Sequence, residues 1–216
     1  MFPIGDDDRA LRTVPIVTYA LLALNILFFV VELNGGEAFI LRWAFIPSRF
    51  IDNPITDSLT LFTSMFMHAG WVHLGGNMLY LWIFGDNVED RFGHIKFTIF
   101  YVLCGVAATF AQLAFNIGSS IPNLGASGAI AGVLGAYILL FPTGRVRVLQ
   151  GFRVIQVPAV IVIGLWIVLQ FYSGFGSIAN ASGTGGVAYM AHIGGFVAGF
   201  VLSFLFKGNS RQRLIR

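Results

Sequence analysis

Charged residues are scarce in this chain and hydrophobic residues are abundant. Of the 216 residues, 11% are charged and 56% are hydrophobic, whereas soluble domains carry about 25% charged residues. This composition excludes an ordinary soluble domain and predicts a polytopic membrane protein. The net charge is only +3, and the basic residues stand at the ends of apolar segments. We therefore expect the lipid bilayer, and no nucleic acid, as a partner.

Cysteine and acidic residues are also few. The single cysteine, Cys104, lies in an apolar run, which excludes an intrachain disulfide and a cysteine-based metal site. No Asp or Glu follows Asp90. The N-terminus is not expected to be a signal peptide, because Asp6, Asp7 and Asp8 precede the first apolar run and no small-residue cleavage site follows it.

Six segments are apolar and long enough to be membrane spans, which need about 20 mostly apolar residues. They cover residues 14–31, 71–87, 97–115, 125–141, 154–172 and 187–206. The expected fold is an all-α bundle of six transmembrane helices, with residues 1–216 forming one membrane domain. The connection over residues 32–70 is too aromatic for a solvated loop, so we expect an interfacial or partly re-entrant element there.

The positions of Lys and Arg predict the orientation. Eleven of the 13 basic residues lie in the N-terminal tail, the second and fourth loops and the C-terminal tail, and the other two, Arg42 and Arg49, lie in the first loop. The positive-inside rule then places both termini in the cytoplasm. The short tails favour the plasma membrane of a prokaryote.

Four polar residues from three spans share one depth. Ser127, His192, His73 and Asn77 all lie roughly 3–9 Å below the predicted outer surface, at 1.5 Å rise per residue. Ionisable residues inside a membrane are costly and usually functional. A Ser beside a His forms a nucleophile with its general base, and a second His and an Asn can donate hydrogen bonds to an oxyanion. His68 lies just above this level.

A catalytic triad would need a carboxylate behind the histidine. None of the acidic residues maps to the depth of His192, so an enzyme built on these residues would use a Ser–His dyad. The sequence lacks H-E-x-x-H, a pair of Asp residues within spans, and the G-x-S-x-G elbow. We therefore expect no metal and no cofactor.

Glycine and alanine crowd the segment around Ser127, which reads NLGASGAIAGVLGAY over residues 123–137. Small residues allow neighbouring helices to approach closely. Gly125 and Gly128 flank Ser127, and Gly195 and Gly199 follow His192 at helical spacing. We expect these glycines to bring the two spans together and to leave room for a substrate backbone and its oxyanion.

Each of these residues also has a purely structural interpretation. A Ser in a glycine-rich span commonly packs, and a His or Asn in a span commonly bonds to a neighbouring helix. Gln112, Gln156 and Gln170 are interpreted as packing or interface residues. The coincidence of depth and membrane side favours catalysis over these alternatives.

At these residues the chain resembles the rhomboid family of intramembrane serine proteases over nearly all six spans. The family's G-x-S-G motif, its H-x4-H-x3-N element, its A-H-x2-G-x3-G element and a Glu followed by a Gly at the inner end of the second span all occur in the expected order. In this chain the G-x-S-G motif is residues 125–128, and the H-x4-H-x3-N element is His68, His73 and Asn77. The A-H-x2-G-x3-G element is Ala191, His192, Gly195 and Gly199, and the Glu and the Gly are Glu89 and Gly93.

The resemblance implies a serine endopeptidase that cleaves membrane-anchored substrates with a single span, near the outer membrane face. Ser127 would be the nucleophile and His192 the base, with His73, Asn77 and the Ser127 amide forming the oxyanion hole. The first loop would be half-submerged, and Arg42 with Trp43 is similar to the family's Trp-Arg pair in reversed order.

One position departs from the family pattern. Some members place an aromatic residue one turn after the serine, packed against the base, whereas this chain has Ala131 there. Another side chain must brace His192, and Tyr189 is a candidate.

Two other functions stay open. A non-enzymatic rhomboid-like protein would guide membrane spans, but such relatives typically lose the Ser or the His. A small transporter would place its site near the membrane midplane, whereas this cluster lies near one face.

Overall fold

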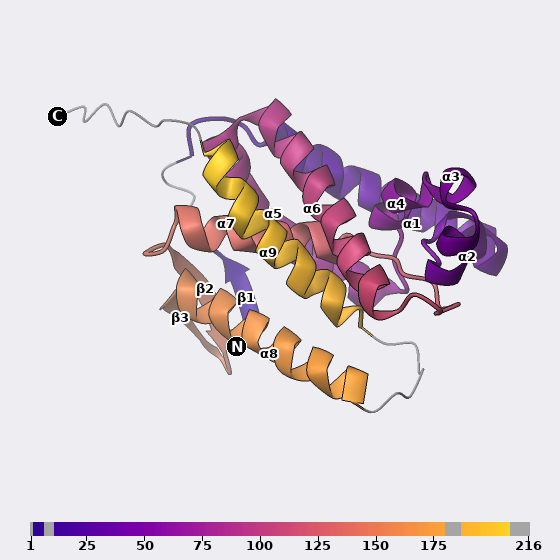
Figure 1. Cartoon of the computed structure of the whole chain (residues 1–216). Helices are drawn as coiled ribbons and strands as arrows, with labels where there is room; N and C mark the ends of the chain where they lie inside the picture. The colour runs from indigo at the N-terminus through magenta and orange to yellow at the C-terminus, as the bar shows by residue number, and fades with distance from the viewer. Residues whose placement is uncertain (1, 7–10, 180–186, 208–216) are drawn as a thin grey trace.

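Six long helices lie where the six apolar segments are predicted (Figure 1). The computed structural model describes residues 2–6, 11–179 and 187–207. The long helices are α1 (Ile16–Trp43), α5 (Trp71–Phe92), α6 (His94–Phe115), α7 (Ser127–Leu140), α8 (Ala159–Ala179) and α9 (Tyr189–Phe206). Arg9 and the arginines after residue 207, which contribute to the predicted orientation, lie outside the described residues.

The helices have the composition of a membrane bundle. Within the described chain, α1, α6, α8 and α9 are long and apolar enough to cross a membrane, and α7 is apolar but shorter. Helix α5 covers the predicted second span but continues past Asn87 to Phe92, and its last turns carry four charged residues. The chain is thus a mostly helical membrane protein, and the number of six spans stays a prediction.

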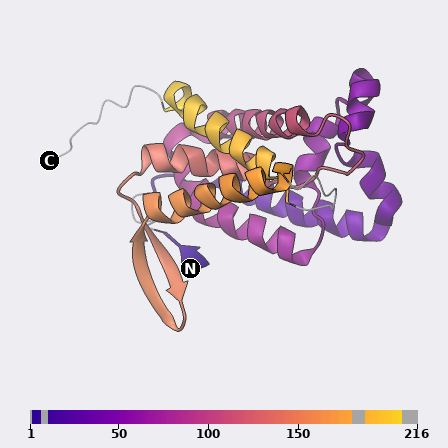
Figure 2. The same ribbon diagram turned by 60° about the horizontal axis from the view of Figure 1, so that its bottom comes forward.

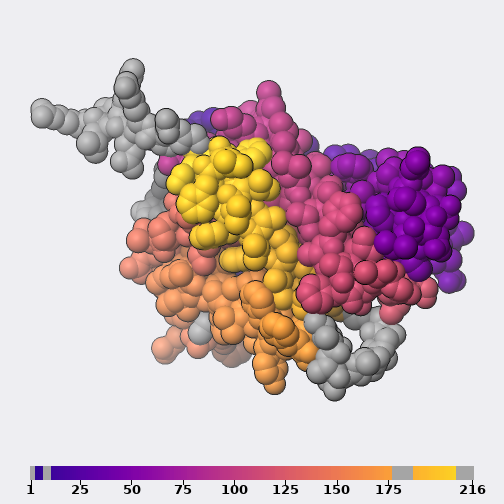
Figure 3. Space-filling model, in the orientation of Figure 1, coloured from indigo at the N-terminus to yellow at the C-terminus, as the bar shows by residue number. Residues whose placement is uncertain are grey.

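Helix α7 forms the centre of the bundle. All residues from 128 to 137 are buried, and α7 packs against α5, α6 and α9. Its small side chains alternate with Ile130, Val133 and Leu134, which join the main hydrophobic core. In the space-filling view, α9 lies between α8 and α6 on one face of the molecule (Figure 3).

The first connection is built from helical pieces rather than open loop. Helix α1 was expected to end near Val31 but continues to Trp43, with a break at Gly36, whose φ of 59° favours glycine. The short helices α2 (Pro47–Asp52), α3 (Pro54–Asp57) and α4 (Thr60–Thr63) and the 3₁₀ turn η2 (Ser64–Phe66) follow at one end of the bundle (Figure 1).

This connection also supports the chain that leads into α7. Phe45 and Asn123 exchange two backbone hydrogen bonds of 3.2 and 2.7 Å, and the Gly125 amide donates to the Ser64 carbonyl at 2.9 Å. The segment before Ser127 is therefore held by main-chain bonds to a region more than fifty residues earlier.

The mostly helical fold confirms the predicted helical bundle, and a small sheet accompanies the helices. Strands β1 (Phe2–Gly5), β2 (Arg145–Gln150) and β3 (Arg153–Pro158) form an antiparallel sheet in the order β1-β2-β3. The β2–β3 hairpin projects from the helices where α7 leads into α8 (Figure 2). The fifth span was expected to begin at Val154, which was wrong, because residues 153–158 pair with β2 and α8 begins at Ala159.

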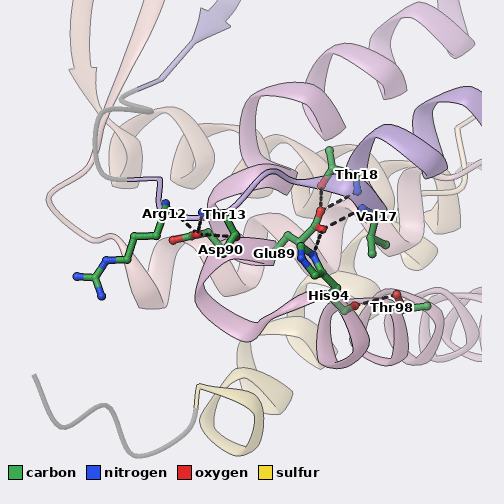
Figure 4. A network of polar contacts seen from close by, with 8 residues as sticks. All are labelled: Arg12, Thr13, Val17, Thr18, Glu89, Asp90, His94 and Thr98. Atoms are coloured by element: carbon green, nitrogen blue, oxygen red, sulfur yellow. Dashed lines mark hydrogen bonds and ion pairs between the residues drawn. The ribbon is translucent and has the colours of Figure 1, made fainter.

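A buried carboxylate joins α5 to the start of α1 (Figure 4). Glu89 is fully buried and accepts hydrogen bonds from the amides of Val17 and Thr18 at 2.9 and 2.7 Å. It also accepts from the Thr18 hydroxyl at 2.7 Å and lies 2.6 Å from His94 Nδ1. The first N–H groups of a helix have no partner within the helix, and α1 has no side-chain cap of its own. Glu89 therefore supplies the cap from a neighbouring helix.

We expect Glu89→Ala to lower the stability of the bundle by about 3 kcal/mol, because it strands several buried donors at once. Thermal unfolding in detergent measures the loss. Glu37→Ala, at an exposed position of α1, is the matched control and should leave the melting temperature nearly unchanged. Equal melting temperatures for the two variants would contradict the capping role of Glu89.

Candidate active site

Ser127 and His192 lie within hydrogen-bond distance of each other, although 65 residues separate them. The Ser127 hydroxyl oxygen lies 2.8 Å from His192 Nε2. Ser127 is the first residue of α7, and His192 lies in the first turn of α9. Both side chains therefore project from helix N-termini at the same end of the bundle, in the geometry of a nucleophile with its base.

Backbone contact between α7 and α9 brings these two residues together. A Cβ added to Gly195 would overlap the carbonyl oxygen of Gly128, and one added to Gly199 would overlap the backbone of Gly132. The helices touch main chain to main chain at two successive turns, which any larger side chain would prevent. The contact begins just below Ser127 and His192 and fixes their separation.

His73 approaches Gly125 and Ser127 from α5, and Asn77 lies one turn further along the same helix. A methyl group placed on Gly125 would lie 3.0 Å from His73 Nε2 and 3.5 Å from the Ser127 hydroxyl. Gly125 has a φ of 131°, so both its conformation and its surroundings favour glycine. Gly125, His73 and Ser127 thus enclose a space that is no larger than a few atoms.

His73 and Asn77 on α5 can each offer a hydrogen-bond donor. His73 Nδ1 accepts a long hydrogen bond from the Ala69 amide, at 3.4 Å, which leaves Nε2 as the N–H donor. Asn77 is buried, and its Nδ2 has no hydrogen-bond partner among the described residues. An unpaired buried amide is costly, so Asn77 Nδ2 is available as a hydrogen-bond donor.

His68 lies beside this cluster rather than in it. Its ring stands edge-on to the His73 ring, with centroids 5.2 Å apart, and its amide donates to Glu32 at 2.9 Å. Glu32 was expected in the first loop but is buried within α1. Its carboxylate holds the turn before α5 and makes no hydrogen bond to His192 in the described structure.

The second nitrogen of His192 faces an amide rather than a carboxylate. Nδ1 lies 2.7 Å from Gln170 Oε1 on α8, and the Trp166 ring lies 5.7 Å from the imidazole, tilted by 37°. These α8 residues take the place in which Tyr189 was expected. Ala131 is fully buried in α7.

A second glutamine holds the start of α9. Gln112 Oε1, from α6, accepts a hydrogen bond of 3.1 Å from the Ala191 amide, one of the N-terminal amides that lack a partner within the helix. Both Gln112 and Gln170 were interpreted as packing or interface residues. They lie near the ends of their predicted spans that share the level of Ser127 and His192, so the depth argument contained the signal to find them.

A small cavity opens beside Ser127. Glycine and alanine supply much of its wall, with polar atoms from η2 and α6; its lining includes Gly105, Ala108, Gly128, Ala191, Ser64 and Thr109. No group of three or more metal-binding side chains occurs among the described residues. The cavity lies next to the Ser127 hydroxyl and is small, with space for a small side chain.

The protein is a helical membrane bundle in which a serine and a histidine are paired near one end. Residues 56–209 match the family model described as Rhomboid domain. The chain belongs to the rhomboid family, which confirms the resemblance seen in the sequence.

Known relatives extend the match over most of the chain. Rhomboid protease GluP of Bacillus subtilis is 34% identical over 192 residues, which cover 86% of this chain and 34% of that protein. Rhomboid protein 1, mitochondrial, of Saccharomyces cerevisiae is 28% identical and is matched over 91% of this chain and 55% of its own length. Rhomboid protease GlpG of Salmonella paratyphi A is 28% identical over 94% of this chain and 67% of its length. The chain thus spans about a third of GluP and about half of the yeast protein.

We expect Gly199→Ala to destabilise the protein by about 1–3 kcal/mol, because the added methyl forces α7 and α9 apart. Thermal unfolding and a disulfide-trapping assay between cysteines placed on α7 and α9 measure stability and separation. Gly164→Ala is the matched control, since nothing lies within 4 Å of its added methyl. A Gly199→Ala protein as stable as the Gly164→Ala protein would refute the close helix contact.

Proposed function

We propose that this protein is an intramembrane serine endopeptidase that cleaves membrane-anchored proteins with a Ser127–His192 dyad. The observation that carries the proposal is the 2.8 Å distance between the Ser127 hydroxyl and His192 Nε2. Family membership and relatives named rhomboid proteases support it. We also propose that residues 1–216 act as one membrane domain.

The first half of the reaction forms an acyl-enzyme. His192 Nε2 accepts the Ser127 hydroxyl proton as the oxygen attacks the scissile carbonyl carbon. The carbonyl π electrons move to oxygen and give a tetrahedral oxyanion. The C–N bond then breaks, the oxyanion returns its electrons to carbon, and His192 gives its proton to the departing amine. The products are an ester of Ser127 with the amino-terminal part of the substrate and a free carboxy-terminal fragment that begins with the new amine.

Donors around Gly125 suit the oxyanion. His73 Nε2, Asn77 Nδ2 and the Ser127 amide come from the two helices that border the space. The Ser127 amide is also one of the first N–H groups of α7, where the helix dipole favours negative charge. Fixed donors of this kind stabilise charge that develops in the transition state.

The second half of the reaction uses water. His192 takes a proton from a water molecule, whose oxygen attacks the ester carbonyl, and the same oxyanion donors apply. The tetrahedral intermediate collapses, the Ser127–carbon bond breaks, and His192 returns the proton to the Ser127 oxygen. The second fragment leaves with a carboxylate, and the dyad is restored without a metal or cofactor.

The substrate follows from the position and size of the site. We propose that the protein lies in the plasma membrane of a prokaryote with both termini in the cytoplasm. The nucleophile then lies near the outer membrane face. A peptide bond within a helix is shielded, so Ser127 requires an extended strand. We propose single-span substrates whose outer end unwinds easily, with a small residue before the cut. The small residues that line the cavity beside Ser127 support this preference.

Two alternatives are weaker. A non-enzymatic relative that guides spans has no use for a hydroxyl held on an imidazole nitrogen. A transporter would need a polar site for its ion or substrate near the membrane midplane. The buried acids Asp6, Glu32 and Glu89 each accept a hydrogen bond from the chain itself, which gives them a structural role instead.

Ser127→Ala and His192→Ala should each abolish cleavage of a single-span model substrate in proteoliposomes while the protein stays folded and inserted. Asn77→Ala should slow cleavage about 10²–10³-fold, the usual effect of losing one oxyanion donor. Gel analysis of product formation measures the rates. Proteolysis by purified Ser127→Ala would end the serine-protease interpretation, and a fully active Asn77→Ala would remove Asn77 from the oxyanion hole.

The cut should fall just inside the outer end of the substrate span, after Ala, Gly or Ser. Mass spectrometry of the fragments from an oriented substrate locates it. Replacing Gly or Pro near the cut with Leu should slow cleavage, because Leu keeps the segment helical. The matched control carries the same exchange at the inner end of the span and should be cut at the original rate. A cut at the cytoplasmic end would contradict the proposed orientation.

A further inference from the structure

His192 is held on both ring nitrogens by side chains from two different helices. Nε2 lies 2.8 Å from the Ser127 hydroxyl on α7, and Nδ1 lies 2.7 Å from Gln170 Oε1 on α8. An amide oxygen can only accept a hydrogen bond. The proton of the neutral imidazole is therefore on Nδ1, and the lone pair is on Nε2, where it faces Ser127.

Helix α8 supplies the remaining contact of the imidazole ring. Trp166 lies one turn before Gln170 on the same side of α8, and its ring lies 5.7 Å from the imidazole. On α7, the position one turn after Ser127 is Ala131, which has no side chain beyond Cβ to restrain the ring. The restraint on the base thus comes from α8.

Among the described residues, the groups that contact the imidazole are uncharged. The acceptor is a neutral amide. A carboxylate at the same place would hold the same proton and also favour the charged imidazolium. The amide fixes orientation without adding this charge effect.

We propose that Gln170 is the positioning residue of the base: it accepts the Nδ1 proton of His192 and thereby aims the Nε2 lone pair at Ser127. The inference rests on the proposed function of the dyad. Gln170 touches neither substrate nor the reacting atoms and acts through His192. Without it, the imidazole can rotate or take the tautomer whose proton is on Nε2, which cannot accept the serine proton.

The orientation of the base then depends on the position of α8. In the apolar stretch of α8, only 17% is buried inside the protein, against 28%, 44% and 33% in the apolar stretches of α1, α6 and α9. Helix α8 lies along α9 at the edge of the bundle (Figures 1 and 3). Displacement of α8 away from α9 removes the Gln170 acceptor and releases His192.

Gln170→Leu tests the proposal, because leucine fills a similar volume and cannot accept the proton. We expect kcat to fall about 10- to 100-fold, the effect of losing a buried hydrogen bond to the base, with KM nearly unchanged. Gln156→Leu, on the exposed part of β3, is the matched control and should keep full activity. Melting temperatures of both variants exclude loss of folding as the cause.

Gln170→Glu separates positioning from simple packing. Its carboxylate accepts the same proton, so we expect it to retain activity at alkaline pH. The added negative charge favours protonated imidazole, so the acid limb of the pH–rate profile should move to higher pH. A merely structural role for Gln170 would leave the position of the acid limb unchanged.

The tautomer of His192 gives a readout that does not need turnover. Nitrogen NMR of histidine-labelled protein, with the His192 signals assigned from a His192→Ala sample, should show the proton on Nδ1 in the wild type and a mixture of tautomers in Gln170→Leu. A wild-type proton on Nε2, or unchanged kcat and tautomer in Gln170→Leu, would overturn the role of Gln170. Cleavage that persists in Ser127→Ala would instead end the proposed function, whatever Gln170 does.

Discussion

The close contact between the backbones of α7 and α9 is the constraint on which the site depends. Gly128 meets Gly195 and Gly132 meets Gly199, each with no room for a Cβ atom. An apolar side chain gains little free energy when it moves from lipid into a helix interface, because both surroundings are apolar. Helices in a membrane therefore associate through close packing and hydrogen bonds. This contact between α7 and α9 sets the distance between Ser127 and His192.

Polar groups at the ends of the helices support this contact. Glu89 caps α1 from α5, and Gln112 satisfies an amide at the start of α9. The Phe45–Asn123 bridge and the Ser64–Gly125 bond fix the chain before Ser127. Since an unsatisfied backbone group is costly away from water, each of these bonds stabilises a segment that carries a functional side chain. Gln170 extends the same pattern to the imidazole itself.

The sequence predicted the parts of this arrangement that depend on periodicity and depth. Ser127, His73, Asn77 and His192 can be grouped because rise per residue and span boundaries give their level. The glycines that follow Ser127 and His192 indicate a close helix pair for the same reason.

The sequence did not predict features that depend on pairing between distant segments. Most of β3 was assigned to the start of a span, because Val154, Ile155 and Val157 are as apolar as a helix requires. Glu32 was assigned to a loop because nothing local shows that α1 continues to Trp43. Gln170 was interpreted as a packing or interface residue, because its contact with the imidazole depends on which helix lies beside His192.

The catalytic role of the pair is tested most directly by mapping the adduct of a serine-directed fluorophosphonate. The reagent requires an activated hydroxyl, so mass spectrometry should place the adduct on Ser127 in the wild type. The adduct should be lost in His192→Ala, which keeps the serine but removes the base. An adduct on another serine, such as Ser64 in the same cavity, or undiminished labelling of Ser127 without His192, would contradict a Ser127–His192 dyad.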